Sequence, residues 1–154
     1  MKRLLSLIPL FFSCLQLGAA QPFHVYSPSS KNNTLWIVQA TPQGDRLELK
    51  VDRKVDLGIA GRVITAHPSK PLLYVTATGG DPGKVPGAVV FLNKDGSYKK
   101  HKNVNFNDGA CYLSLDKENR HILGVSYGNG RLNVYPLDDQ GIPGKAVTTV
   151  DEGK

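Results

Sequence analysis

Apolar residues beyond position 21 fall into short runs, and residues that favour turns separate these runs from one another. The runs are rich in β-branched and aromatic side chains, which are typical of strands. No window of about 11 residues has apolar side chains at positions i, i+3, i+4 and i+7 with capping residues around it. The pattern therefore predicts an all-β chain. The expected strands are residues 35–38, 63–65, 72–76, 88–92, 111–115, 122–125, 132–135 and 146–150.

The predicted turns contain glycine at regular positions, which indicates an internal repeat. Gly44, Gly96 and Gly141 each open a hairpin, at spacings of 52 and 45 residues. Gly61 and Gly109 form a second series, 48 residues apart, and each precedes a strand, a turn and another strand. Four short strands every 45 to 50 residues or so is the period of a β-propeller blade. The other turn signals are Gly79-Gly80-Asp81-Pro82, Asn107-Asp108-Gly109 and Gly128-Asn129-Gly130.

Residues 21–154 have room for only part of a propeller. They provide about 2.5 to 3 four-stranded antiparallel blades, whereas propellers typically have about four to eight. A blade buries its faces against its neighbours, so the ring is predicted not to close. We therefore expect self-association through an exposed blade face.

The first 20 residues differ from the rest of the chain and have the features of a secretory signal peptide. They combine a basic head, Lys2-Arg3, with an apolar run from Leu4 and small residues up to Ala20. The run has about 16 residues, interrupted by a proline and a glutamine, whereas a spanning helix needs ~20. We expect an exported chain, periplasmic or secreted, with no membrane span. Its signal peptide is residues 1–20 and its mature domain is residues 21–154.

Of the two cysteines, only Cys111 lies beyond the expected signal peptide, so no disulfide can form within the mature chain. Lipidation of Cys14 is disfavoured, because Phe11 occupies the position where a lipobox has a branched aliphatic residue. Cys111 lies in an apolar run with no cationic neighbour that would activate its thiol. It is predicted to be a small buried hydrophobe.

The formal net charge of +6 falls to +4 when Lys2-Arg3 is removed with the signal peptide. So small a charge does not indicate a nucleic-acid partner. The one dense basic run, Lys99-Lys100-His101-Lys102, follows the Gly96 hairpin and is predicted to be a solvated strand face. No histidine has a second ligand at metal-binding spacing, so no metal and no cofactor are expected. The histidines, each expected at the surface or satisfied within a turn, are His24, His67, His101 and His121.

Three segments combine a strand with an adjoining turn in a specific pattern: Phe23-His-Val-Tyr-Ser-Pro-Ser-Ser, His67-Pro-Ser-Lys-Pro-Leu-Leu-Tyr-Val, and Gly124-Val-Ser-Tyr-Gly-Asn-Gly-Arg-Leu-Asn-Val-Tyr-Pro-Leu-Asp-Asp. Together they resemble the seven-bladed β-propeller lactonase family, which includes the 6-phosphogluconolactonases of the propeller type. The resemblance covers residues 22–154 and only the N-terminal portion of a family member. It implies that the predicted blades belong to a seven-bladed ring.

The resemblance implies hydrolysis of a sugar lactone, with a His, arginines and a Glu around one mouth of the central channel. In the family the first of these residues follows the segment that resembles residues 146–153, and this chain ends at Lys154. The resemblance therefore places no catalytic residue in this chain and predicts that the chain is inactive alone. The alternative is a non-catalytic, exported propeller module that binds or scaffolds a partner.

By the same resemblance, the loop that contains Tyr127 and Asn129 faces the channel mouth. There the two side chains would form hydrogen bonds to hydroxyl groups of a small-molecule lactone. The competing interpretation is structural. In that view Asn129-Gly130 is a tight hairpin turn that needs positive φ, and Tyr127 packs on the adjacent blade.

Overall fold

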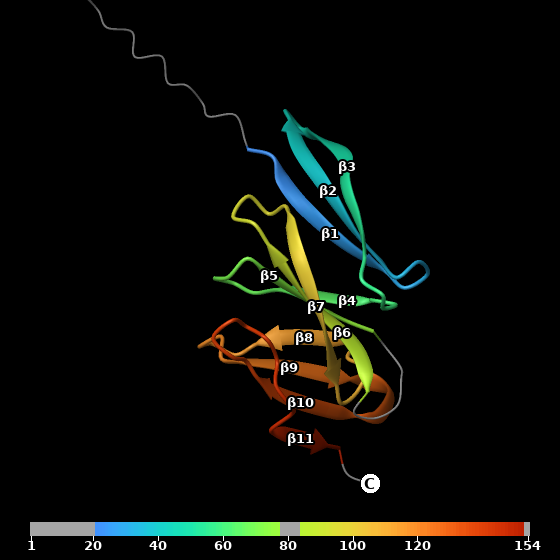
Figure 1. Cartoon of the computed structure of the whole chain (residues 1–154), viewed down its shortest axis with the longest axis vertical. Coiled ribbons are helices and arrows are strands. Elements are labelled where there is room, and N and C mark those ends of the chain that lie inside the picture. Colours follow the sequence, from blue (N-terminus) through green and yellow to red (C-terminus); the bar gives the residue numbers. More distant parts are fainter. Residues whose placement is uncertain (1–20, 78–83, 153–154) are drawn as a thin grey trace, which may run out of the picture.

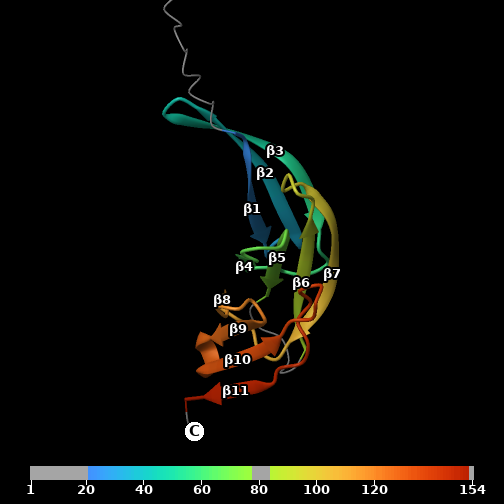
Figure 2. The ribbon, with the colours of Figure 1, turned by 90° about the vertical axis from the view of Figure 1, so that its left-hand side faces the viewer.

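The computed structural model describes residues 21–77 and 84–152, and this part of the chain forms three antiparallel sheets. The sheets follow one another along an arc that does not close on itself (Figure 1 and Figure 2). The expected all-β fold and the open, partial propeller are confirmed. The predicted signal peptide, Cys14 and the turn at residues 79–82 lie outside the described residues.

Each sheet is a meander in which strands consecutive in sequence are paired. The first sheet contains β1 (Phe23–Ser29), β2 (Thr34–Gln43) and β3 (Arg46–Asp56). The second contains β4 (Val63–Ala66), β5 (Leu72–Thr76), β6 (Val85–Leu92) and β7 (Tyr98–Phe106). The third contains β8 (Tyr112–Leu115), β9 (His121–Ser126), β10 (Arg131–Pro136) and β11 (Thr148–Asp151), with a 3-10 turn, η1 (Tyr127–Asn129), between β9 and β10. Across residues 21–77 and 84–152, no helix has the length and hydropathy to cross a membrane.

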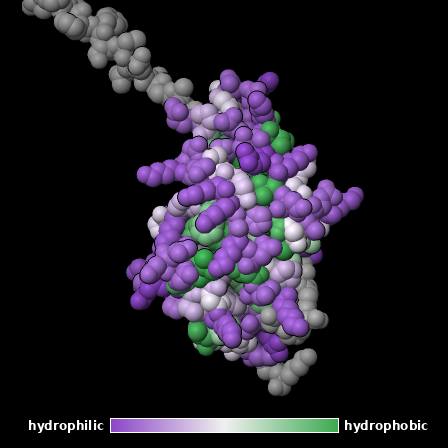
Figure 3. Space-filling view, viewed as in Figure 1, coloured by the Kyte–Doolittle hydropathy of each residue, from purple (hydrophilic) through white to green (hydrophobic). Residues whose placement is uncertain are grey.

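The hydrophobic pattern does not predict β1, β3 and β7, and it places the start of β11 two residues too early. β3 and β7 are the outer strands of their sheets and are largely exposed, so charged residues interrupt their apolar alternation. The basic run at residues 99–102 lies on β7 with its lysines exposed, which confirms the predicted solvated face. Hydrophilic side chains cover most of the molecular face seen in Figure 3.

The three hairpin glycines of the predicted repeat all have left-handed backbone conformations. Their φ angles are 65° at Gly44, 85° at Gly96 and 80° at Gly141. Each lies in the turn that precedes the outermost strand of its sheet. Because only glycine adopts this conformation without steric cost, the glycine spacing reports the repeat of the fold itself.

The sheets are held together by two apolar layers, one on each side of the second sheet. Between the first and second sheets lie the buried side chains of Leu35, Ile37, Val55, Leu57, Ile59, Leu73, Val75, Ala88, Val90 and Leu92. Between the second and third sheets lie those of Leu72, Tyr74, Val85, Val89, Phe106, Ala110, Leu113, Ile122 and Tyr135. Successive residues of β5 contribute to opposite layers, as the alternation of side chains along a strand requires. This is why residues 72–76 read as an uninterrupted apolar run.

A tyrosine hydroxyl links each of the first two sheets to the hairpin glycine of the next sheet. Tyr26 Oη on β1 donates to the Gly96 carbonyl at 2.6 Å, and Tyr74 Oη on β5 donates to the Gly141 carbonyl at 2.9 Å. Burial, with a smaller effect of Asp138, raises the pKa of Tyr74 to about 12, so its hydroxyl remains a donor. These two bonds fix the positions of neighbouring sheets relative to each other.

Cys111 is not the buried hydrophobe that its apolar run predicts. It is exposed just before β8, and its Sγ donates to the Val125 carbonyl at 3.3 Å. β8 is an edge strand of the third sheet and is paired on one side only. An apolar run therefore does not guarantee burial at the edge of a sheet.

Replacing Gly87 with Ala tests the close packing of the second sheet. A Cβ on this β6 residue would overlap the Phe106 ring and lie 2.9 Å from the Val75 carbonyl oxygen. We expect Gly87→Ala to lower the free energy of unfolding by about 1–3 kcal/mol, measured by urea denaturation. Gly128→Ala is the matched control, because a Cβ there meets nothing within 4 Å. Equal stability of the two variants would contradict the predicted packing.

Candidate functional site

The turn η1 contains both residues that the sequence resemblance singles out. It connects the end of β9 to the start of β10 in the third sheet, and Gly130 ends it with a left-handed φ of 64°. The structural interpretation predicted positive φ across Asn129-Gly130, and among these two residues only Gly130 shows it. The side chains of Tyr127 and Asn129 have different surroundings, which separates their roles.

Asn129 is anchored to a buried carboxylate on the loop between β7 and β8. Its Nδ2 donates to Asp108 Oδ1 at 2.7 Å, and Asn133 Nδ2 on β10 donates to Asp108 Oδ2, also at 2.7 Å. Asp108 is only 7% exposed, and Arg131 Nη1 lies 3.6 Å from its Oδ1. A buried carboxylate is tolerated when both oxygens are hydrogen-bonded and a cation is near, which is the arrangement here.

A second layer of polar contacts fixes the residues that hold Asp108. Thr149 Oγ1 on β11 donates to Asn133 Oδ1 at 2.6 Å. Arg131 Nε donates to Asp151 Oδ2 at 3.0 Å, and this bond is the main cause of the raised pKa of Arg131. The third sheet thus braces η1 through side chains of β10 and β11.

The other end of this loop is fixed by an aromatic pair. Tyr135 Oη accepts a hydrogen bond from the Asn107 backbone N–H at 2.9 Å. The Tyr135 ring meets the Phe106 ring edge to face, with centroids 5.0 Å apart. Asp108 therefore follows a residue whose backbone is already held against the core.

Tyr127 projects from η1 into solvent with 90% of its surface exposed. The structural interpretation predicted that this ring packs on an adjacent blade. That prediction is wrong for the described residues, because the ring lies in solvent and packs on none of the three sheets. Asn129 is also exposed, but its amide Nδ2 is engaged by Asp108, so this residue positions the turn. Tyr127 has no such role and is the candidate that we assign to a ligand.

The sequence analysis assigned Asp108 to a turn and did not detect the network around it. One signal in the sequence points to this network. Asn133 is a polar residue inside an apolar strand run, and such a residue needs a partner when it is buried. Asp108 lies in the loop that leads into the same sheet, but the contact spans 25 residues and cannot be read from local patterns.

The geometry around η1 supports binding rather than proton transfer. Both Asp108 oxygens accept amide hydrogen bonds, so the carboxylate is not free to act as a base. The described network contains no histidine, and no group of His, Cys, Asp and Glu residues in the described part of the chain could hold a metal ion. What the site offers is an exposed phenol on a turn of fixed position.

A family model described as "Lactonase, 7-bladed beta-propeller" matches residues 25–154. The chain belongs to the seven-bladed β-propeller lactonase family. Comparison with the curated proteins gives no match. The matched range includes all three sheets from the third residue of β1 to the end of β11, so the sheets are blades of a lactonase propeller.

In this lactonase chain, loss of the Asp108 carboxylate is expected to destabilise the third blade. Asp108→Ala leaves the buried Asn133 amide without its acceptor, and we expect the free energy of unfolding to fall by about 2–4 kcal/mol in chemical denaturation. Tyr127→Ala removes a side chain that is mostly in water, so its effect should stay within about 0.5 kcal/mol. A stable Asp108→Ala variant would show that the network does not brace the turn.

Proposed function

We propose that this chain forms part of the substrate-binding wall of an exported sugar lactonase of the 6-phosphogluconolactonase type, and that it does not hydrolyse the lactone by itself. The observation that supports binding is the exposed Tyr127 ring on a turn braced by buried Asp108. A phenol both donates and accepts hydrogen bonds, as recognition of sugar hydroxyls requires. Export rests on the signal-like composition of residues 1–20.

Inactivity is proposed from the chemistry of the described residues. Lactone hydrolysis needs a base for the attacking water and donors for the charge that develops on the acyl oxygen. Near η1 the only cation of the network, Arg131, is paired with Asp151 and lies close to Asp108. The network therefore has neither a free base nor a free cation for this reaction.

The purified chain is expected to hydrolyse 6-phosphogluconolactone no faster than the spontaneous reaction in buffer. The rate is measured by acid release at constant pH, with heat-denatured protein as a blank. Turnover that scales with protein concentration would overturn the proposed inactivity and leave the binding proposal standing.

Binding is tested separately with the stable product, 6-phosphogluconate, in an NMR titration. We expect the amide signals of Gly128 and Gly130 to shift, and Tyr127→Ala to abolish these shifts. Tyr112→Ala is the matched control, since this tyrosine is also exposed but lies on β8. Shifts that persist in Tyr127→Ala, or no shifts in the unaltered chain, would contradict the assigned role of Tyr127.

The exposed face of the third sheet supports the alternative function, a module that binds a protein partner. We propose that this partner is a second copy of the chain. Tyr112, Val125, Leu132 and Val150 form one row across its four strands, because each is paired with the next in the sheet register. Tyr112 and Val150 are more than half exposed. An exposed apolar row of this kind marks an interaction surface.

The free face at the other end of the arc has a matching character. Val25, Val38 and Val51 are paired across the first sheet, and Phe23, Ala40 and Leu49 form the next row. Within the chain, the sheets already associate through such apolar rows. Stacking of the third sheet of one copy on the first sheet of another would repeat this contact head to tail.

We expect the purified chain to form dimers or larger species, detected by size exclusion with light scattering. Val150→Asp should shift the population toward monomer, because it places a charge within the apolar row of the proposed contact. Val147→Asp is the control. This residue is 63% exposed, against 54% for Val150, but lies just before β11 and outside the row. A monomeric unaltered chain, or an equal effect of both substitutions, would contradict this interface.

A further inference from the structure

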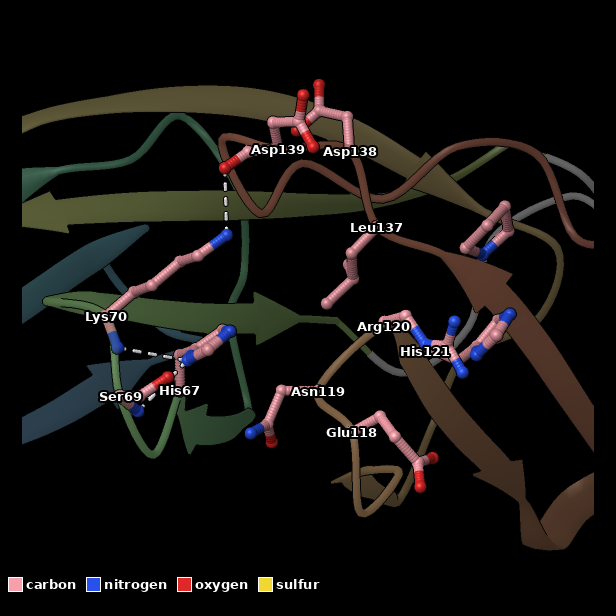
Figure 4. A pocket seen from close by; sticks show the side chains of 11 residues that line it. His67, Ser69, Lys70, Glu118, Asn119, Arg120, His121, Leu137, Asp138 and Asp139 are labelled. Atoms are coloured by element: carbon pink, nitrogen blue, oxygen red, sulfur yellow. Dashed lines mark hydrogen bonds between the residues drawn. The ribbon is translucent and has the colours of Figure 1, made fainter.

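A cavity lies between the second and third sheets, at the end of the strands opposite η1. It has a volume of about 540 Å³ and is lined by the turn between β4 and β5, the turn between β8 and β9, and the segment after β10 (Figure 4). Because β9 runs from the Asn119 turn to η1, the cavity and Tyr127 lie at opposite ends of the same strand. The proposed lactone contact at η1 does not involve this cavity.

His67 lies at the inner wall of the cavity with one ring nitrogen unused. Its Nδ1 accepts hydrogen bonds from the backbone N–H groups of Ser69 at 3.2 Å and Lys70 at 3.1 Å. The proton of the neutral ring must therefore be on Nε2. The side chain is 95% buried, and Nε2 has no hydrogen-bond partner in the structure. Figure 4 shows the ring directed into the space between Lys70 and Leu137.

The fold itself does not require a histidine at this position. Asp116 occupies the equivalent turn of the third sheet. Its backbone N–H donates to the His121 carbonyl five residues later, and the backbone N–H of His67 likewise donates to the Leu72 carbonyl. Asp116 Oδ1 accepts the backbone N–H groups of Arg120 and His121, so a carboxylate oxygen holds this turn where Nδ1 holds the His67 turn, although it binds N–H groups further along the turn. Nε2 of His67 is thus an additional donor that turn formation does not use.

His67 is held in its neutral form. Burial, and then the charge of Lys70, lower its pKa below the usual value, so at neutral pH the ring has a single N–H, on Nε2. A buried N–H without an acceptor is unfavourable, and a ligand that supplies one would relieve this cost. Nε2 itself is closed to solvent, so the ligand must displace a neighbouring group at the cavity wall to reach it.

The charges around the cavity restrict which ligand can supply the acceptor. The lining residues include two cations, Lys70 and Arg120, and three carboxylates, those of Glu118, Asp138 and Asp139, which is a formal balance of −1. An anion is disfavoured by this balance. A primary ammonium group has no lone pair to accept the His67 proton. A neutral hydroxyl satisfies both conditions, because it accepts from Nε2–H and donates to a carboxylate.

We propose that this cavity binds a neutral polyhydroxylated molecule of monosaccharide size, with a hydroxyl oxygen that accepts the hydrogen bond of His67 Nε2. The volume is within the range of about 300–1,000 Å³ typical of small-molecule sites. Lys70 is held in place by a 2.8 Å hydrogen bond from its Nζ to the Asp139 carbonyl.

An NMR titration of the purified chain with glucose and with myo-inositol tests the proposal. The readouts are the imidazole signals of His67 and the backbone amides of Lys70 and Asn119. We expect saturable shifts with at least one of the two neutral compounds. Glucuronate and glucosamine, which add a negative and a positive charge to the same sugar ring, should bind at least several-fold more weakly. Absence of shifts with both neutral compounds would show that the site holds water only and would overturn the proposal. Preferential binding of glucuronate would also overturn it.

His67→Asn removes the Nε2 donor while its side-chain oxygen can still accept the two backbone N–H groups. We expect affinity for the neutral ligand to fall about tenfold, as for loss of one hydrogen bond, followed at the Lys70 and Asn119 amides. His101→Asn on β7 is the matched control and should bind normally. Unchanged affinity in His67→Asn would contradict the role of Nε2. Should this variant be unfolded in its far-UV circular dichroism, the order of affinities in the unaltered chain still decides the proposal.

Discussion

The second sheet depends on burial of both of its faces, and this constraint organises the rest of the molecule. Leu73 and Val75 of β5 point into one apolar layer, and Leu72 and Tyr74 point into the other. A four-stranded sheet with two apolar faces is not stable alone in water, because neither face can be solvated favourably. The first and third sheets must therefore stack on it, and the stacking direction sets the arc seen in Figure 2.

The sequence pattern predicts the fold class and the partial propeller because both depend on local signals. Hairpin glycines are tied to backbone conformation, and the two inner strands of the second sheet, β5 and β6, contain uninterrupted apolar runs. β3 and β7 are missed because they lie in water on the outside of the arc, where lysines and arginines replace apolar residues. The burial of Cys111 is mispredicted for a related reason, since an edge strand has no neighbour to cover it.

Only part of the candidate site can be predicted from the sequence. Family resemblance draws attention to the turn with Tyr127 and Asn129, but the partner that braces it, Asp108, comes from the loop between two sheets. Likewise, the His67 turn is recognisable as a turn, whereas the free Nε2 and its surroundings are created by the third sheet. In both places the chemistry arises where two sheets meet, and residue order alone does not report which side chains meet there.

The tyrosine bonds between sheets stop at the third sheet. Tyr74 lies seven residues after His67, and Asp116 occupies the position of His67 in the third sheet. The residue seven positions after Asp116 is Leu123, which is therefore equivalent to Tyr74. Leucine has no hydroxyl, so this face lacks the directional anchor that joins the earlier sheets. A molecule that rests on this face is not tied at this position, and its orientation depends on the apolar row and on the exposed Tyr112 hydroxyl.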